Sequence, residues 1–111
     1  MKQIFIVYGK PMTGKSILFN QAVKVEHDDC FYSVWFSRKI IEQNIKSIVI
    51  DDFNINPDDC RALAIELYKL QKVLDYVIII TNCRQDQLHL LSDRLQILSI
   101  PISICEMRNE V

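Results

Sequence analysis

The segment GKPMTGKS, residues 9–16, holds the only two glycines of this 111-residue chain. Gly9 and Gly14 stand directly ahead of Lys15 and Ser16, in the spacing G-x-x-x-x-G-K-[ST]. Glycine has no Cβ, so the backbone can wrap closely around an anion, and successive N–H groups and a helix N-terminus then point at that anion. The segment therefore predicts a loop that binds phosphate groups.

The sequence on either side of this loop has the pattern that such a loop requires. Residues 4–8 are a continuous apolar run, which predicts a strand buried on both faces. From Lys15 the pattern predicts a helix, because apolar residues recur at spacings of three and four, at Leu18, Ala22 and Val25. In the order strand, loop, helix, the lysine neutralises the outer phosphates and the Ser16 hydroxyl ligates Mg²⁺. An ordinary strand-to-helix turn is the alternative.

Composition predicts one small cytoplasmic domain over residues 1–111. Half of the residues are hydrophobic, and 13 basic side chains against 14 acidic ones give a net charge of −1. The chain therefore has no general positive field, and contact with DNA would need a local basic patch. The apolar run at residues 4–8 is too short for a signal peptide or a membrane span. The four cysteines are far apart in the sequence, which favours reduced thiols over a metal site or disulfides.

Strand and helix patterns alternate along the rest of the chain. Strands are predicted at residues 31–36, 46–53, 76–80 and around Pro101, and helices at residues 37–44, from Pro57 with Asn56 as N-cap, and 87–97. Proline removes a backbone donor, so the last strand is expected at a sheet edge. This alternation predicts an α/β fold with a mainly parallel sheet and helices on both faces.

Two polar sites are expected where buried strands end. Asp51 and Asp52 follow the apolar part of strand 46–53, and open α/β sheets place ligand chemistry at the carboxyl ends of their strands. Asp51 is expected to hold Mg²⁺ through water beside Ser16, and Asp52 to polarise an attacking water. Asn82 follows strand 76–80 and is expected to orient that water or to sense the γ-phosphate. The alternatives are that the aspartates begin a turn and that Asn82 caps one.

Taken together, the phosphate loop, the "IVIDDF" strand and the "IIITN" strand resemble the additional-strand-catalytic-glutamate (ASCE) division of P-loop NTPases, over nearly the whole chain. "IIITN" followed by "LLSDRLQILSIPI" is similar to AAA+ replication initiators and their loaders. "IVYGKPMTGK" resembles the FtsK–HerA group, which includes viral packaging ATPases and phage assembly proteins. Most members of both branches work as rings on nucleic acid. The resemblance therefore implies an ATPase in DNA replication, remodelling or packaging, acting as a homo-oligomer or with a larger protein partner.

The resemblance also implies a fold and a set of site residues. The fold is a three-layer αβα sandwich with a five-stranded sheet in the order 5-1-4-3-2, numbered along the chain. ATP is expected to contact Gly9, Lys10, Pro11, Met12, Thr13, Gly14, Lys15, Ser16 and Ile17. Catalysis is expected to use Lys15, Asp52 and Asn82, with Arg94 as an arginine finger toward a neighbouring subunit and Arg84 as its rival. Ser16 and Asp51 are expected to hold Mg²⁺.

Two features depart from the family pattern. Asp52 occupies the position that usually holds the catalytic glutamate, and its shorter side chain is expected to move the water and slow hydrolysis. No helical lid domain follows the last predicted strand. The sequence therefore also leaves open a nucleotide-dependent binding module without turnover, or a small nucleoside or nucleotide kinase. It does not distinguish ATP from GTP.

Overall fold

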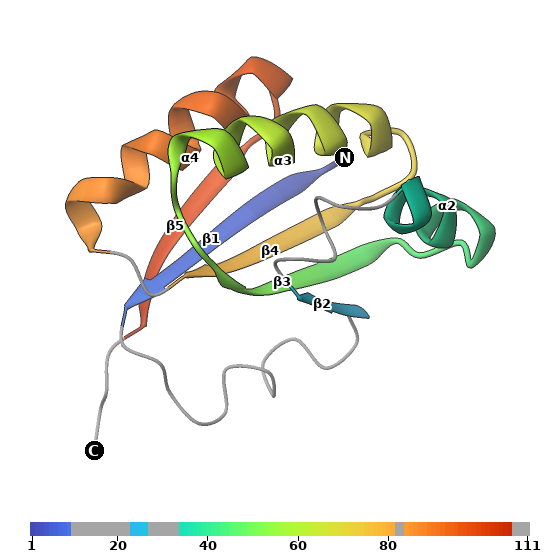
Figure 1. Ribbon diagram of the computed structural model, residues 1–111, viewed down its shortest axis with the longest axis horizontal. Coiled ribbons are helices and arrows are strands. Elements are labelled where there is room, and N and C mark those ends of the chain that lie inside the picture. The colour runs from blue at the N-terminus through green and yellow to red at the C-terminus, as the bar shows by residue number, and fades with distance from the viewer. Residues whose placement is uncertain (10–22, 27–33, 82–83, 108–111) are drawn as a thin grey trace.

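The computed structural model describes residues 1–9, 23–26, 34–81 and 84–107, and these build a parallel sheet covered by helices (Figure 1). The strands are β1 (Gln3–Gly9), β2 (Val23–Glu26), β3 (Ser47–Phe53), β4 (Tyr76–Thr81) and β5 (Ile102–Met107). The helices are α2 (Val34–Glu42), α3 (Pro57–Leu70) and α4 (Leu88–Leu95). Short 3₁₀ turns, η2 (Gln85–Gln87) and η3 (Gln96–Leu98), flank α4. The expected α/β class and parallel sheet are confirmed.

The sheet has five strands in the order β2-β3-β4-β1-β5, and every neighbouring pair is parallel. β4 lies between β1 and β3, with Ile4 opposite Val77 on one side and Ile48 opposite Val77 on the other. The apolar runs of β1, β3 and β4 suit this position, because a central strand of a parallel sheet is buried on both faces. All five strands point the same way, so their carboxyl ends form a single edge.

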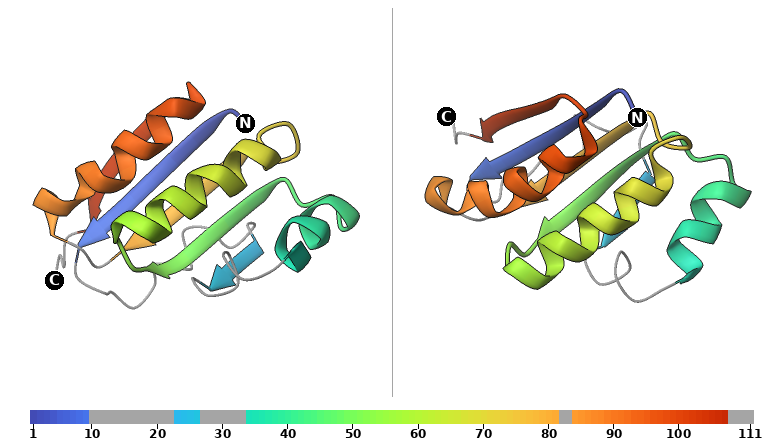
Figure 2. Two further views of the ribbon diagram at one scale, coloured as in Figure 1. Left: turned by 45° about the horizontal axis from the view of Figure 1, so that its top comes forward. Right: turned by 90° about the horizontal axis from the view of Figure 1, so that it is seen from above.

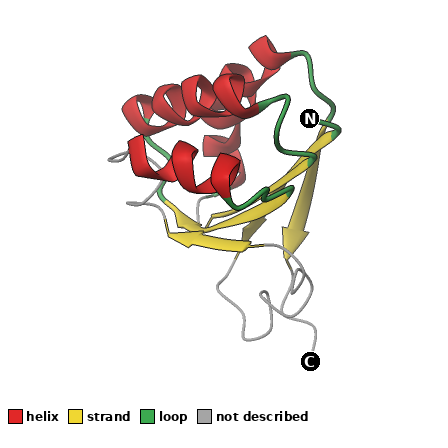
Figure 3. Cartoon of the chain, turned by 90° about the vertical axis from the view of Figure 1, so that its right-hand side faces the viewer, coloured by secondary structure: helices red, strands yellow, loops and turns green. Residues whose placement is uncertain are grey.

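The described helices all cover one face of the sheet, as Figures 2 and 3 show. One large hydrophobic core joins this face to α2, α3 and α4. A second, smaller cluster lies on the other face and is built from Val7, Val49, Ile78 and Ile80. The helix expected from Lys15, which would supply the third layer, falls mostly outside the described residues.

Helix α3 begins and packs as its sequence predicts. The Asn56 side-chain oxygen accepts the N–H of Asp59 at 2.9 Å, and Pro57 takes the first helical position, where its missing donor costs nothing. The buried side chains recur at spacings of three and four, at Cys60, Leu63, Leu67 and Leu70. This stripe anchors α3 to the sheet, and α4 lies beside it in both views of Figure 2.

Two predicted elements are wrong. Residues 34–36 of the expected strand 31–36 belong to helix α2, which continues through the expected helix 37–44 as far as Glu42. The edge beside β3 is instead held by β2, which includes Val25, a residue that the apolar spacing predicts at the end of the helix from Lys15. The alternation Val-Lys-Val-Glu suits a short, half-exposed strand. The segment fits both this strand pattern and the helical spacing, and its pairing with β3 selects the strand.

The C-terminal elements differ only at their boundaries. The helix expected over residues 87–97 is α4 with a tighter 3₁₀ turn at each end. Pro101 precedes β5 rather than interrupting it, and its carbonyl accepts the N–H of Ile4 at 2.9 Å. β5 stands at the end of the sheet, as the proline predicts.

Candidate functional site

Three neighbouring strands bring candidate site residues to the carboxyl edge of the sheet. Tyr8 of β1 and Phe53 of β3 both lie opposite Thr81 of β4. Neighbouring strands are about 4.8 Å apart, so the ends of β1 and β3 are separated by about 10 Å across β4. Gly9 and the acidic pair, Asp51 and Asp52, therefore flank the end of the same central strand.

Gly9 has a backbone conformation that suits glycine. It is the last residue of β1, and its φ is 125°. An L-residue with a Cβ avoids this region because of steric clashes, whereas glycine enters it freely. The first glycine of the motif thus turns the chain at the point where β1 ends and the loop begins.

A β-bulge places the acidic pair. Ile50 lies opposite Ile79 and Phe53 lies opposite Thr81, so the two aspartates of β3 stand against a single residue of β4. Asp52 has a φ of 52°, in the left-handed region that aspartate tolerates better than most residues. The bulge also returns Phe53 to the helix side, where it is buried in the main core three positions after Ile50.

The two carboxylates have different environments. Asp51 is half-buried, and its Oδ1 accepts the backbone N–H of Asp52 at 2.9 Å, which orients the carboxyl group. Asp52 is exposed at the edge. Mg²⁺ is commonly held by one or two carboxylates together with waters and substrate phosphates. The pair suits that role, although the described residues contain no cluster of three or more His, Cys, Asp or Glu that could form a complete metal cage.

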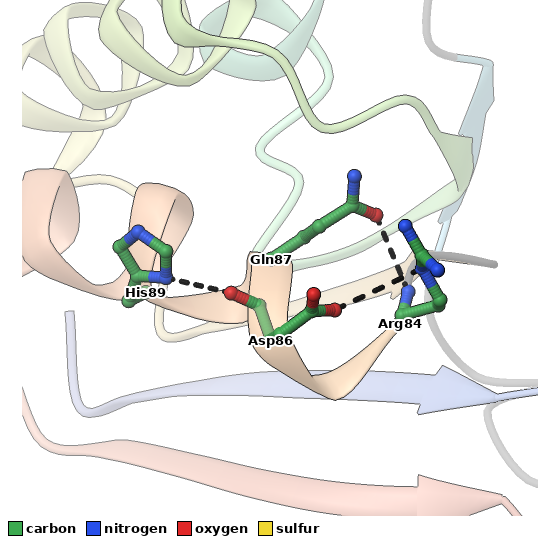
Figure 4. A network of polar contacts seen from close by, with 4 residues as sticks. All are labelled: Arg84, Asp86, Gln87 and His89. Atoms are coloured by element: carbon green, nitrogen blue, oxygen red, sulfur yellow. Dashed lines mark hydrogen bonds and ion pairs between the residues drawn. The ribbon is translucent and has the colours of Figure 1, made fainter.

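The turn that follows β4 carries Arg84 (Figure 4). The Arg84 N–H donates to Gln87 Oε1 at 3.3 Å, and His89 Nδ1 lies 2.8 Å from the Asp86 carbonyl oxygen. Arg84 Nε is 3.9 Å from Asp86 Oδ1, and the two side chains are 83% and 72% exposed. A pair this open is weak, so the Arg84 guanidinium is accessible close to the carboxyl edge.

Arg94 lies far from the acidic pair within one chain. It is exposed in the last turn of α4, and α4 connects the carboxyl end of β4 to the amino end of β5. Its turn is therefore at the amino edge of the sheet, while Asp51 and Asp52 are at the carboxyl edge. Any contact between Arg94 and this site would have to come from another subunit, as its expected role requires.

The remaining predicted site residues lie outside the described residues. They are Lys10, Pro11, Met12, Thr13, Gly14, Lys15, Ser16, Ile17 and Asn82. The bulge at Asp51 and Asp52 is the feature of the site that the sequence analysis missed. Its signal is visible in "IVIDDF", where Phe53 follows Ile50 by three residues instead of two or four, the wrong parity for a regular strand.

Two further findings complete the description of the site. Within the described ranges, no helix combines the length and the apolar character that crossing a bilayer requires. No protein-family model, curated protein or solved structure matches the chain.

Proposed function

We propose that this protein binds ATP with Mg²⁺ at the carboxyl edge of its sheet and hydrolyses it. The observation that carries the proposal is the meeting of two motifs at one edge. GKPMTGKS begins at the end of β1, with Gly9 in a glycine-type conformation, and the acidic pair ends β3 one strand away. Phosphate-binding loops and metal-holding aspartates work together only when they share such an edge.

The strand order supports an assignment to the ASCE division of P-loop NTPases. In that division another strand separates the phosphate-loop strand from the acidic strand, and here β4 lies between β1 and β3. β5 lies on the far side of β1, and β2 (Val23–Glu26) lies on the far side of β3, in the place that the expected order 5-1-4-3-2 gave to strand 31–36. The assigned fold is then an αβα P-loop domain.

Each site residue has a chemical role in this proposal. Lys15 neutralises the outer phosphates, while Ser16 and Asp51 hold Mg²⁺, Asp51 through a water. Asp52 polarises the attacking water, which its exposure at the edge permits. Asn82, directly after β4, orients that water or senses the γ-phosphate. Since Asp52 is one methylene shorter than glutamate, slow turnover is expected.

A guanidinium would stabilise the charge that develops on the transferred phosphoryl group. Arg94 is proposed to do this for the nucleotide of a neighbouring subunit, which makes a homo-oligomer part of the mechanism. Arg84 is the rival, and its accessible side chain near the carboxyl edge is in its favour. On the resemblance to AAA+ and FtsK–HerA proteins, the energy of hydrolysis would serve DNA replication, remodelling or packaging.

The direct test is ATP binding by Lys15→Ala, measured by calorimetry in the presence of Mg²⁺. Binding is expected to be lost while the circular dichroism spectrum and melting temperature stay unchanged, because the lysine acts on phosphate. Lys72→Ala is the matched control, since Lys72 is an exposed lysine in the turn between α3 and β4, at the opposite edge of the sheet. Equal ATP affinity in wild type and Lys15→Ala would contradict the proposal.

A nucleotide-dependent binding module is the second candidate, favoured by the short Asp52 side chain. An assay with radiolabelled ATP, with and without single- and double-stranded DNA, separates the two. An ATPase releases phosphate, and a motor does so faster when DNA is present. A binding module retains ATP with negligible turnover under all three conditions.

A further inference from the structure

The amino edge of the sheet carries lysines that the proposed nucleotide site does not use. Lys2 and Lys46 directly precede β1 and β3, and both are exposed. Backbone hydrogen bonds place them on either side of Asp75, because the Lys2 N–H donates to the Asp75 carbonyl oxygen at 2.7 Å and the Asp75 N–H donates to the Lys46 carbonyl oxygen at 2.7 Å. Neighbouring strands are about 4.8 Å apart, so the backbones of the two lysines are separated by about 10 Å.

The turn between α3 and β4 adds a third lysine to this edge. Lys72 is exposed in that turn, and Lys46 Nζ lies 3.5 Å from the Val73 carbonyl oxygen, so the Lys46 ammonium group lies against the same turn. Figure 2 shows the turn beside the start of β1. Lys2, Lys46 and Lys72 therefore form one group, which we call the amino-edge lysines.

The two edges of the sheet differ in charge within the described residues. The connections at the amino edge, residues 1–2, 43–46, 71–75 and 99–101, contain the three amino-edge lysines and a single acid, the half-buried Asp75. At the carboxyl edge, the described ends of β3 and β4 carry Asp51, Asp52 and Asp86 against Arg84. The near-neutral chain thus has a local basic patch at its amino edge, of the kind that contact with nucleic acid requires.

An exposed aromatic ring lies within this patch. Tyr76 follows Asp75, is 37% exposed, and lies opposite Gln3 of β1 and Ser47 of β3. Its side chain is on the sheet face away from the described helices, because the next residue of β4 is buried in the helix-side core. The Tyr76 and Phe5 ring centroids are 6.5 Å apart, with an angle of 31° between the ring planes. Phe5 packs on the smaller hydrophobic cluster and so supports the tyrosine ring from one side.

We propose that the amino edge binds single-stranded nucleic acid, with a base stacked on Tyr76 and neighbouring phosphates on Lys2 and Lys46. Proteins that bind single strands combine cations that follow the backbone with aromatic rings on which bases stack. Here the two lysines flank the strand that begins with the ring. In a duplex the bases are already paired and stacked, so only the phosphates can use this surface. The inference goes beyond the nucleotide site, since it uses the opposite edge and requires neither ATP nor Mg²⁺.

The first test measures the fluorescence anisotropy of labelled oligothymidylate and oligouridylate, without ATP or Mg²⁺. The two oligonucleotides show whether the surface prefers DNA or RNA, and wild type is expected to bind at least one of them more tightly than a duplex of the same length. Tyr76→Ala is expected to weaken this binding about tenfold, and Tyr76→Phe, which keeps the ring, to stay within about twofold of wild type. Tyr68→Ala is the matched control, because Tyr68 is 61% exposed on α3, which covers the other face of the sheet.

The second test uses salt to count the phosphate contacts. Each lysine that neutralises a phosphate of a single strand contributes about 0.7 to the slope of log affinity against log salt concentration. Replacing both Lys2 and Lys46 by glutamine is therefore expected to lower the slope by about 1.4. Arg61→Gln is the matched control, since Arg61 is exposed in the first half of α3, toward the carboxyl edge, and its slope is expected to equal that of wild type. Melting temperatures of all variants show that they are folded.

Three results would overturn the proposal: a wild type that binds neither single strand, a loss in Tyr68→Ala as large as in Tyr76→Ala, or an unchanged salt slope after both lysines are replaced. Duplex binding that is as tight as single-strand binding, and insensitive to Tyr76→Ala, also contradicts it, because the surface then recognises negative charge alone. None of these results bears on ATP binding, which the Lys15→Ala experiment tests separately.

Discussion

Replacing Asp52 tests whether the acidic pair stands in a bulge with one left-handed residue. The Asp52 φ of 52° costs an L-residue with a Cβ about 1–2 kcal/mol, and for a β-branched residue the cost is at the upper end of this range. Glycine has no such cost. Because the Asp52 side chain is exposed, replacing it with valine or with glycine removes no core packing. We expect Asp52→Val to be about 2 kcal/mol less stable than Asp52→Gly.

Urea unfolding followed by circular dichroism measures this difference. With a slope of about 2 kcal/mol per molar urea, the midpoints of the two variants should differ by about 1 M. The same two substitutions at Asp93, which is exposed within α4, provide the control. There the order should reverse, since glycine is the poorer helix former by a few tenths of a kcal/mol. An Asp52→Val variant as stable as Asp52→Gly would refute the left-handed bulge.

Two other substitutions separate chemistry from folding. Asp52→Asn keeps the backbone preference but removes the charge, so single-turnover hydrolysis should fall much more than ATP affinity; equal losses would show that Asp52 serves Mg²⁺ instead. Asn56→Ala removes the side-chain acceptor for the Asp59 N–H and should cost about 1 kcal/mol in thermal unfolding, while Asn56→Ser should restore most of it. If Asn56→Ala were as stable as wild type, the capping role of Asn56 would be contradicted.

The central part of the fold follows from short-range signals. The apolar runs of β1, β3 and β4 predict buried strands because such runs are typical of the central strands of a parallel sheet. Asn56 and Pro57 predict the first residue of α3 correctly, because capping is local chemistry. The same signals predict that Gly9 and the two aspartates share an edge. For these elements the local sequence signals agree with the conformation that the fold requires.

The segments that sequence reasoning misassigned are those decided by distant contacts. Val25 satisfies the helical spacing from Leu18, and Val23 satisfies it from Phe19. Both valines also satisfy strand alternation, and pairing with β3 selects the strand. The aromatic residues at 31–36 favour a strand by propensity, yet residues 34–36 are helical within α2, whose Ile40 is buried in the main core. The bulge at Asp52 likewise depends on the register between β3 and β4.

The position of β1 has a consequence for how the chain reaches its fold. Among the described strands β1 is synthesised first and its two neighbours last, because Gln3 pairs with Tyr76 and Ile4 with Ile102, at sequence separations of 73 and 98 residues. Closing loops of this length before any pairing stabilises them makes folding slow. The apolar run of β1 therefore has neither of its strand partners until β4 and β5 have been synthesised, and during that interval a chaperone would matter most to this protein.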